Sequence, residues 1–145
     1  MERKRGAVYP EDITVNRKIS VSDISVTEGD AGTTNAVLTI TIDYPSTRTI
    51  LVQYNTGDDT ATVGSDYTFT NGTVTFAPGE TSKTVSVPIF GDTLDEGNET
   101  FMLLLHTVSG AVIVKDTGVG TIVDDDTGKG AVWDRAVWDG TDVFL

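Results

Sequence analysis

Hydrophobic and polar residues alternate with a period of two through most of the middle of this chain. In the segment 37–44, for example, Leu38, Ile40 and Ile42 are separated by single polar residues. A β-strand places successive side chains on opposite faces, so this alternation is typical of a strand with one buried and one solvent-facing side. No window has the spacing of an amphipathic helix. The sequence therefore predicts an all-β fold.

Seven such segments follow one another, separated by short turn sequences rich in Gly, Pro, Asn and Ser. The expected strands are 19–27, 37–44, 49–56, 72–76, 83–90, 99–108 and 111–123. Seven strands over about a hundred residues match a seven-stranded antiparallel immunoglobulin-like β-sandwich. Pro88 lacks the N–H that a central strand needs, so we expect 83–90 at a sheet edge or bulged.

A chain of 145 residues has room for one domain of this kind. We expect the sandwich at 19–126, an N-terminal arm at 1–18 and an aromatic C-terminal arm at 127–145. The formal net charge of −12 would repel phosphates, so nucleic acid is not an expected partner. The chain has no cysteine, no apolar run long enough to cross a membrane and no signal-peptide pattern behind its basic N-terminus. Membrane insertion is therefore not expected, and two locations stay open: a cell surface, within a larger exported protein, or a virion.

Carboxylates recur where the expected strands end. Eight of them form the candidate set: Glu28, Asp66, Asp92, Glu96, Glu99, Asp124, Asp125 and Asp126. Strand ends on one side of a sandwich converge, and like charges brought together repel unless a cation neutralises them. Oxygen ligands in this number favour Ca²⁺, which takes about 6 to 8 of them. The alternative is an acidic surface that only keeps the protein soluble, and Asp58, Asp59 and Asp95 are less certain members.

Five motifs, in this order, are similar to those of a known family. They are Val-Thr-Glu-Gly at 26–29, Gly-Ser-Asp-Tyr at 64–67, Gly-Thr-Val-Thr-Phe-Ala-Pro-Gly-Glu at 72–80, Asp-Thr-Leu-Asp-Glu-Gly-Asn-Glu-Thr-Phe at 92–101 and Gly-Thr-Ile-Val-Asp-Asp-Asp at 120–126. From 20 to 126 the chain resembles the Calx-β family. Its members are immunoglobulin-like modules of the cytoplasmic regulatory loop of the sodium/calcium exchanger, of integrin β4 and of bacterial surface proteins.

The resemblance implies that the eight acids are calcium ligands and that the backbone carbonyl of Leu94 is a further one. One departure matters. The strongest calcium binders of the family have an acid where this chain has Gly91, so the resemblance implies fewer ions or weaker binding here.

Three functions are compatible with these features. The first is a non-enzymatic calcium-binding structural or adhesive module. The second is an assembly protein of a virion, shell or tube whose arms dock onto neighbouring copies. The third is a glycoside hydrolase using paired acids, which is disfavoured because the acids match a cation site motif by motif. His106, the only histidine, has no catalytic motif beside it.

Partners are suggested by two apolar features. The expected strand 99–108 carries Met102, Leu104 and Val108 on what should be its solvent-facing side, and the C-terminal arm repeats Ala-Val-Trp-Asp, with Trp133 and Trp138. Large aromatic side chains usually dock, because burial is their main contribution to stability. We therefore expect a homo-oligomer in which Trp133 and Trp138 cover this face of a neighbour. The alternatives are an arm that folds back on its own domain, and ordinary exposed apolar residues.

Overall fold

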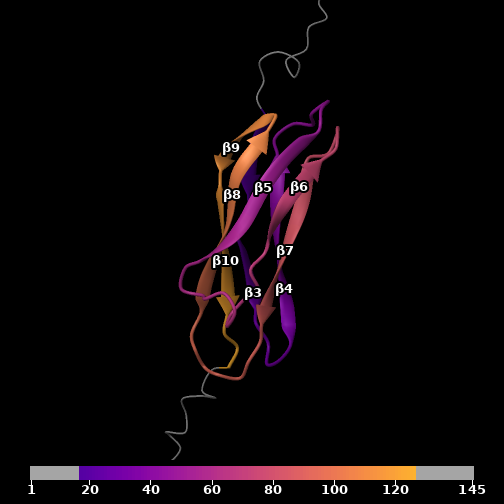
Figure 1. Cartoon of the computed structure of the whole chain (residues 1–145). Helices are drawn as coiled ribbons and strands as arrows, with labels where there is room; N and C mark the ends of the chain where they lie inside the picture. Colours follow the sequence, from indigo (N-terminus) through magenta and orange to yellow (C-terminus); the bar gives the residue numbers. More distant parts are fainter. Residues whose placement is uncertain (1–16, 127–145) are drawn as a thin grey trace, which may run out of the picture.

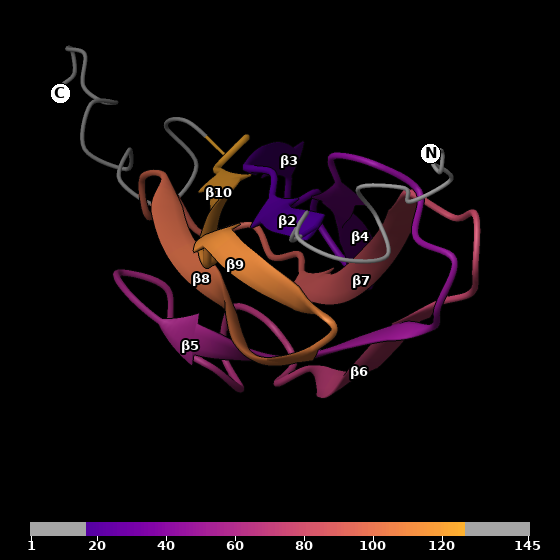
Figure 2. The same ribbon diagram turned by 90° about the horizontal axis from the view of Figure 1, so that it is seen from above.

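The structure, a computed structural model, describes residues 17–126 as two β-sheets packed face to face (Figures 1 and 2). One sheet has five strands, in the order β3 (Ile24–Thr27), β10 (Thr117–Val123), β8 (Glu99–Ser109), β5 (Ile50–Asp58) and β6 (Asn71–Phe76). The other has four, in the order β7 (Ser82–Phe90), β4 (Thr33–Ile42), β2 (Arg17–Val21) and β9 (Ala111–Lys115). The expected all-β sandwich is confirmed. Among the described residues there is no helix that could cross a membrane.

The core lies between the two sheets and consists of the residues that alternation predicted to face inward. Leu38, Ile40 and Ile42 of β4 are almost completely buried, as are Val52 of β5 and Leu103 of β8. Burying an aliphatic side chain of this size contributes about 1.5–3 kcal/mol to folding. The alternation that predicts the strands therefore also stabilises the packing of one sheet on the other.

Two of the seven expected strands are each divided between the sheets, so residues 17–126 contain nine strands. The segment 19–27 becomes β2 and β3, and the segment 111–123 becomes β9 and β10. β2 pairs with β9 and β3 pairs with β10, and both pairs are parallel. The other pairs are antiparallel, as expected. β2 begins at Arg17, inside the range expected for the N-terminal arm.

Lys115 links the two segments, 19–27 and 111–123, at the point where each passes from one sheet to the other. Its Nζ donates hydrogen bonds to the carbonyl oxygens of Val21 at 2.7 Å and Thr117 at 2.9 Å, and to the carboxylate of Asp23 at 3.1 Å. Asp23 also accepts a hydrogen bond from the N–H of Val119 at 2.9 Å. One ammonium group thus satisfies acceptors on both segments, and this fixes the two crossings relative to each other.

A β-bulge in β8 corrects one expectation about its outer face. Gln53 of β5 pairs with Thr107, but the next residue, Tyr54, pairs with Leu105, so His106 is an extra residue in β8. An extra residue reverses the alternation beyond it. Val108 therefore packs against the core instead of sharing the outer face with Met102 and Leu104.

Met102 and Leu104 are only half-buried, and they lie beside Gly57 of the neighbouring strand β5. The expected partners of this face, Trp133 and Trp138, lie outside the described residues, as do most of the N-terminal arm and the whole C-terminal arm. Assembly through the arms stays a prediction. The expectation for Pro88 is confirmed, because β7 lies at the edge of its sheet and β4 is its only neighbour among the strands of residues 17–126.

Candidate metal centre

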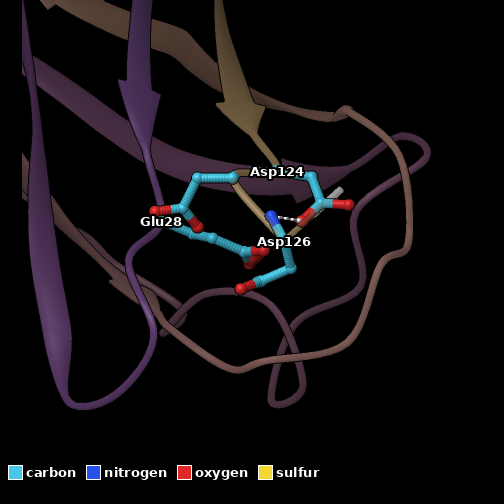
Figure 3. A group of neighbouring side chains, drawn as sticks. Glu28, Asp124 and Asp126 are labelled. Carbon is cyan, nitrogen blue, oxygen red and sulfur yellow. Dashed lines mark hydrogen bonds between the residues drawn. The ribbon is translucent and has the colours of Figure 1, made fainter. Parts of the chain in front are cut away.

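The parallel pairing of β3 and β10 places two acidic segments at the same end of the sandwich. Thr27 of β3 is opposite Val123 of β10, so Glu28 and Asp124 are the next residues along two adjacent strands that run in the same direction. The N–H of Glu28 donates to the carbonyl of Val123 at 3.0 Å, which extends the pairing by one residue. Figure 3 shows the side chains of Glu28, Asp124 and Asp126 gathered where these two strands end. Glu28 is 5% exposed and Asp126 is fully buried.

Asp124 organises the loops around it. Its Oδ2 accepts hydrogen bonds from the N–H groups of Glu96 at 2.7 Å and Gly97 at 2.9 Å, and its Oδ1 accepts one from the N–H of Asp126 at 2.9 Å. These three donors, led by Asp126, lower the pKa of Asp124 to about 2. The Asp124 carboxylate therefore stays charged and ties the loop before β8 to the end of β10.

The loop between β7 and β8 carries three candidate ligands, Asp92, Leu94 and Glu96, and approaches the turn after Glu28 closely. The N–H of Asp92 donates to the carbonyl of Gly29 at 3.1 Å. A Cβ atom on Gly91 would lie 2.7 Å from the carbonyl oxygen of Gly29 and 2.9 Å from that of Glu28. Gly91 is therefore required by backbone packing. Position 91 is where the resemblance described above leads one to expect an acid in a strong calcium site, and in this chain it has no room for a side chain.

Leu94 lies in the same loop, with its side chain 56% exposed and its N–H donating to Asp92 Oδ1 at 2.9 Å. Its carbonyl as a ligand stays a prediction.

Asp66 comes from the loop between β5 and β6, and hydrogen bonds fix its position. Its Oδ2 accepts from the N–H of Thr62 at 2.8 Å, and its carbonyl accepts from the N–H of Phe90, the last residue of β7, at 2.9 Å. Asp66 thus reaches the acidic end of the sandwich through a contact with β7, although its own loop belongs to the other sheet.

The structure brings all eight predicted carboxylates together in three overlapping groups. The groups are Glu28 with Asp124, Asp125 and Asp126; Glu28 with Asp92 and Glu96; and Asp66 with Glu96 and Glu99. Glu28 and Glu96 each belong to two groups, so the three groups form one connected row. Within each group, one oxygen of every carboxylate lies within 4.8 Å of the others. Two ligands on opposite sides of one Ca²⁺ ion are about 4.6–5.2 Å apart, so each group has the dimensions of a single coordination sphere.

Burial and mutual repulsion disfavour the negative charges of three carboxylates in the row. Burial and the neighbouring Asp92, Asp124 and Asp126 raise the pKa of Glu28 to about 8. Burial, followed by Asp66 and Glu96, raises the pKa of Glu99 to about 7. The pKa of Glu96 is raised for the same reasons, with burial first. These carboxylates are therefore destabilised when ionised, and a bound cation would remove that cost.

Sequence reasoning missed one supporting residue. Asn98 accepts a hydrogen bond from the N–H of Asp124 at 2.9 Å through its side-chain oxygen. The sequence feature that could have indicated this role is the position of Asn98 in an acidic loop, directly before Glu99.

The less certain acids lie outside the three groups. Asp58 accepts hydrogen bonds from the N–H of Val63 at 2.9 Å and from the hydroxyl of Tyr67 at 2.5 Å. Asp59 accepts one from the hydroxyl of Thr100 at 2.6 Å. Asp95 is in none of the three groups.

Curated relatives match about half of the chain. The sodium/calcium exchanger 1 of Rattus norvegicus is 44% identical over 73 residues, which is 50% of this chain and 8% of the exchanger. The bovine (Bos taurus) exchanger 1 is 42% identical over the same length and the same shares. The human (Homo sapiens) exchanger 3 is 46% identical over 61 residues, 42% of this chain and 7% of that protein. The similarity thus concerns one small part of much longer proteins.

Solved structures share the fold. The crystal structure of the apo form of the Calx CBD1 domain has a TM-score of 0.65 at 23% identity and covers 77% of this chain and 100% of that one. The Calx CBD2 domain has a TM-score of 0.66 at 15% identity, covering 84% of this chain and 95% of that one. At these identities the likeness supports the fold alone. The sequence model of the Calx-beta domain, however, matches residues 11–126, and the chain therefore belongs to the Calx-beta family.

Proposed function

We propose that this chain is a non-enzymatic Ca²⁺-binding module in which bound ions hold together the loops at one end of the β-sandwich. The observation that carries the proposal is the row of three carboxylate groups joined through Glu28 and Glu96. Membership of the Calx-beta family supports it. So does the likeness to a structure described as the calcium binding domain CBD12 of CALX1.1, with a TM-score of 0.68, 22% identity, and coverage of 76% of this chain and 47% of that one.

The proposed role of the ion follows from where its ligands originate. Glu28 follows β3, Asp125 follows β10, Glu96 lies between β7 and β8, and Asp66 lies between β5 and β6. Without a cation these carboxylates repel one another. With ions bound in the three groups, the four segments are linked in a row through the shared ligands Glu28 and Glu96 and become mutually fixed. The module would then supply a calcium-dependent stiff end to the protein that contains it, which is a structural or adhesive role.

The arrangement also supports a non-enzymatic role. Each group holds three or four carboxylates whose oxygens lie within 4.8 Å of one another, which is the size of one coordination sphere. A glycoside hydrolase instead uses two carboxyl groups about 5 to 9.5 Å apart with a sugar ring between them. The charge and closeness of these acids favour cation binding over sugar cleavage.

Calorimetric titration and thermal melting test the proposal. Calcium added to EDTA-treated protein should bind, and at 100-fold over Kd it should stabilise the fold by about 2.7 kcal/mol, or about 10 °C in Tm. Glu28→Gln and Glu96→Gln should weaken binding most, because each removes a ligand from two groups. Glu80→Gln, which alters a partly exposed acid that is paired with Lys83 at 3.1 Å and lies outside the three groups, is the matched control. A Tm that is the same in calcium and in EDTA would refute calcium binding.

A further inference from the structure

A hollow of about 480 Å³ lies on the five-stranded sheet, between β5, β6 and β8 and the loop that joins β5 to β6. Its lining includes Gln53, Asn55, Phe69, Asn71, Thr73 and His106. Val52 and Thr56 of β5 are buried, so the alternation of the strand turns Gln53 and Asn55 away from the core. The hollow is therefore on the outer side of the sandwich. It shares no residue with the three carboxylate groups.

The backbone gives this place its shape. Gly72 pairs with Tyr54, and the Tyr54 hydroxyl lies where a side chain at position 72 would begin, 3.0 Å from a Cβ atom built there. On the other side of β5, the bulge in β8 presents His106, which is exposed. Phe69 projects from the β5–β6 loop with 53% of its surface exposed. Bulges re-aim side chains and are common beside functional sites.

The lining differs in composition from the rest of this strongly acidic chain. None of the described residues that line the hollow is Asp, Glu, Lys or Arg, whereas 22% of the chain is charged. The amides of Gln53 and Asn71 make no hydrogen bond to another residue in 17–126, so both can bind a ligand. Each amide offers two donors and an acceptor. No lysine or arginine of residues 17–126 lines the hollow to hold an anion, and a metal cation would be held far better by the carboxylates at the end of the sandwich.

We infer that this hollow binds a neutral glycan. Adjacent hydroxyl groups of a sugar match amides that donate and accept at once, and the apolar face of a pyranose ring packs on an exposed aromatic ring. Gln53, Asn71 and Thr73 supply the polar contacts, and Phe69 supplies the ring. The hollow shares no residue with the proposed calcium site, although Phe69 is three residues from Asp66 along the β5–β6 loop. His106 is seven residues beyond Glu99 along β8, about 23 Å at the rise of an extended strand.

Affinity electrophoresis provides the test. The chain is run in native gels that contain one of four neutral polysaccharides, namely laminarin, dextran, hydroxyethyl cellulose or galactomannan, and in a gel that contains anionic alginate. At least one neutral polysaccharide should retard the protein, and alginate should not. Phe69→Ala should lower the apparent affinity by about tenfold, the factor expected from losing one aromatic contact. Val114→Ala, at an apolar residue that is 61% exposed on β9, is the matched control and should leave the retardation unchanged.

Nuclear magnetic resonance locates the ligand independently of the variants. Titration with the oligosaccharide unit of the retarding polysaccharide should shift the backbone amide signals of Gln53, Asn71 and Thr73, in EDTA as well as in calcium. Failure of all four neutral polysaccharides to retard the chain would overturn the inference, as would retardation that Phe69→Ala leaves intact. Binding that requires calcium and shifts Glu28 instead would place the ligand at the carboxylate row and would also overturn it, without affecting the proposed calcium site.

Discussion

Asp124 Oδ2 accepts a hydrogen bond from the N–H of Glu96 at 2.7 Å, so a carboxylate at the end of β10 closes the loop that precedes β8. Glu96 in turn belongs to two of the three carboxylate groups. The acids of the row therefore have different tasks. Asp124 shapes the backbone that presents ligands, whereas Glu28 and Glu96 each offer an oxygen to two of the groups and Asp125 offers one to the first.

Replacing Asp124 should destabilise the calcium-free protein. Asp124→Ala removes the acceptor of three backbone N–H groups, at Glu96, Gly97 and Asp126, so the Tm in EDTA should fall by several degrees. Asp125→Asn is the matched comparison, because Asp125 is exposed and belongs to the same group. It should weaken calcium binding and leave the Tm in EDTA equal or higher, since one repelling charge is gone. Equal losses of Tm in EDTA for both variants would contradict this division of roles.

The calcium-free protein should lose stability as the pH rises from 5 to 8. Glu28 and Glu99 have pKa values raised from the ordinary 4.5 to about 8 and about 7. Between these values the folded state holds protons that the unfolded state has released, so deprotonation on raising the pH favours unfolding. The slope is about 1.4 kcal/mol per pH unit for each group that differs fully between the two states. Urea unfolding in EDTA at pH 5, 6, 7 and 8 measures it.

Saturating calcium should abolish this slope, because the ion binds the deprotonated carboxylates. Glu28→Gln should reduce the slope in EDTA as well. Asp124 does not contribute in this range, since its pKa of about 2 keeps it ionised throughout. Stability in EDTA that rises from pH 5 to pH 8 would contradict the burial of these carboxyl groups.

Gly120→Ala should destabilise the sandwich whether or not calcium is present. A Cβ atom at Gly120 would lie 2.2 Å from the ring of Phe101, which stacks on Tyr67 with ring centroids 5.0 Å apart. Inserting a methyl group into packed side chains costs about 1–3 kcal/mol. Gly57→Ala is the control, because its Cβ would be 3.3 Å from the flexible end of Leu104. Urea unfolding of the two variants should give a clearly larger loss for Gly120→Ala, and equal losses would count against the stacked packing.

Introducing the acid that is missing at position 91 should not strengthen calcium binding. Gly91→Asp adds a carboxylate, but its Cβ would meet the backbone oxygens of Gly29 and Glu28 and displace the turn that carries Glu28. The Tm in EDTA should fall, and calorimetry should give an affinity no higher than that of the unchanged chain. Gly91→Ala separates the steric effect from the charge. A tighter calcium site together with an unchanged Tm in EDTA would refute the steric argument.

Local sequence was enough to predict most of the fold. Alternation located the segments of β4, β5, β7 and the first part of β8, because a strand with one buried face must alternate. The missing N–H of Pro88 predicted an edge strand or a bulge, and β7 is an edge strand. Alternation was insufficient in two places. It predicted single strands at 19–27 and 111–123, because a segment that changes sheets keeps its local pattern. It also placed Val108 on the outer face, because a regular alternation does not reveal the extra residue at His106.

For the carboxylate row, the sequence by itself determined which acids follow the ends of strands, and therefore which ones could meet. Only the tertiary structure decided which acids lie together as candidate ligands and which one orders the backbone of the loops. The parallel register of β3 and β10 brings Glu28 next to Asp124, and loop hydrogen bonds make Asp124 an organiser of the backbone. Close packing of two turns leaves Gly91 without room for a side chain. The physical reason is that burial, register and backbone contact depend on segments about 30 to 100 residues apart, which no local pattern records.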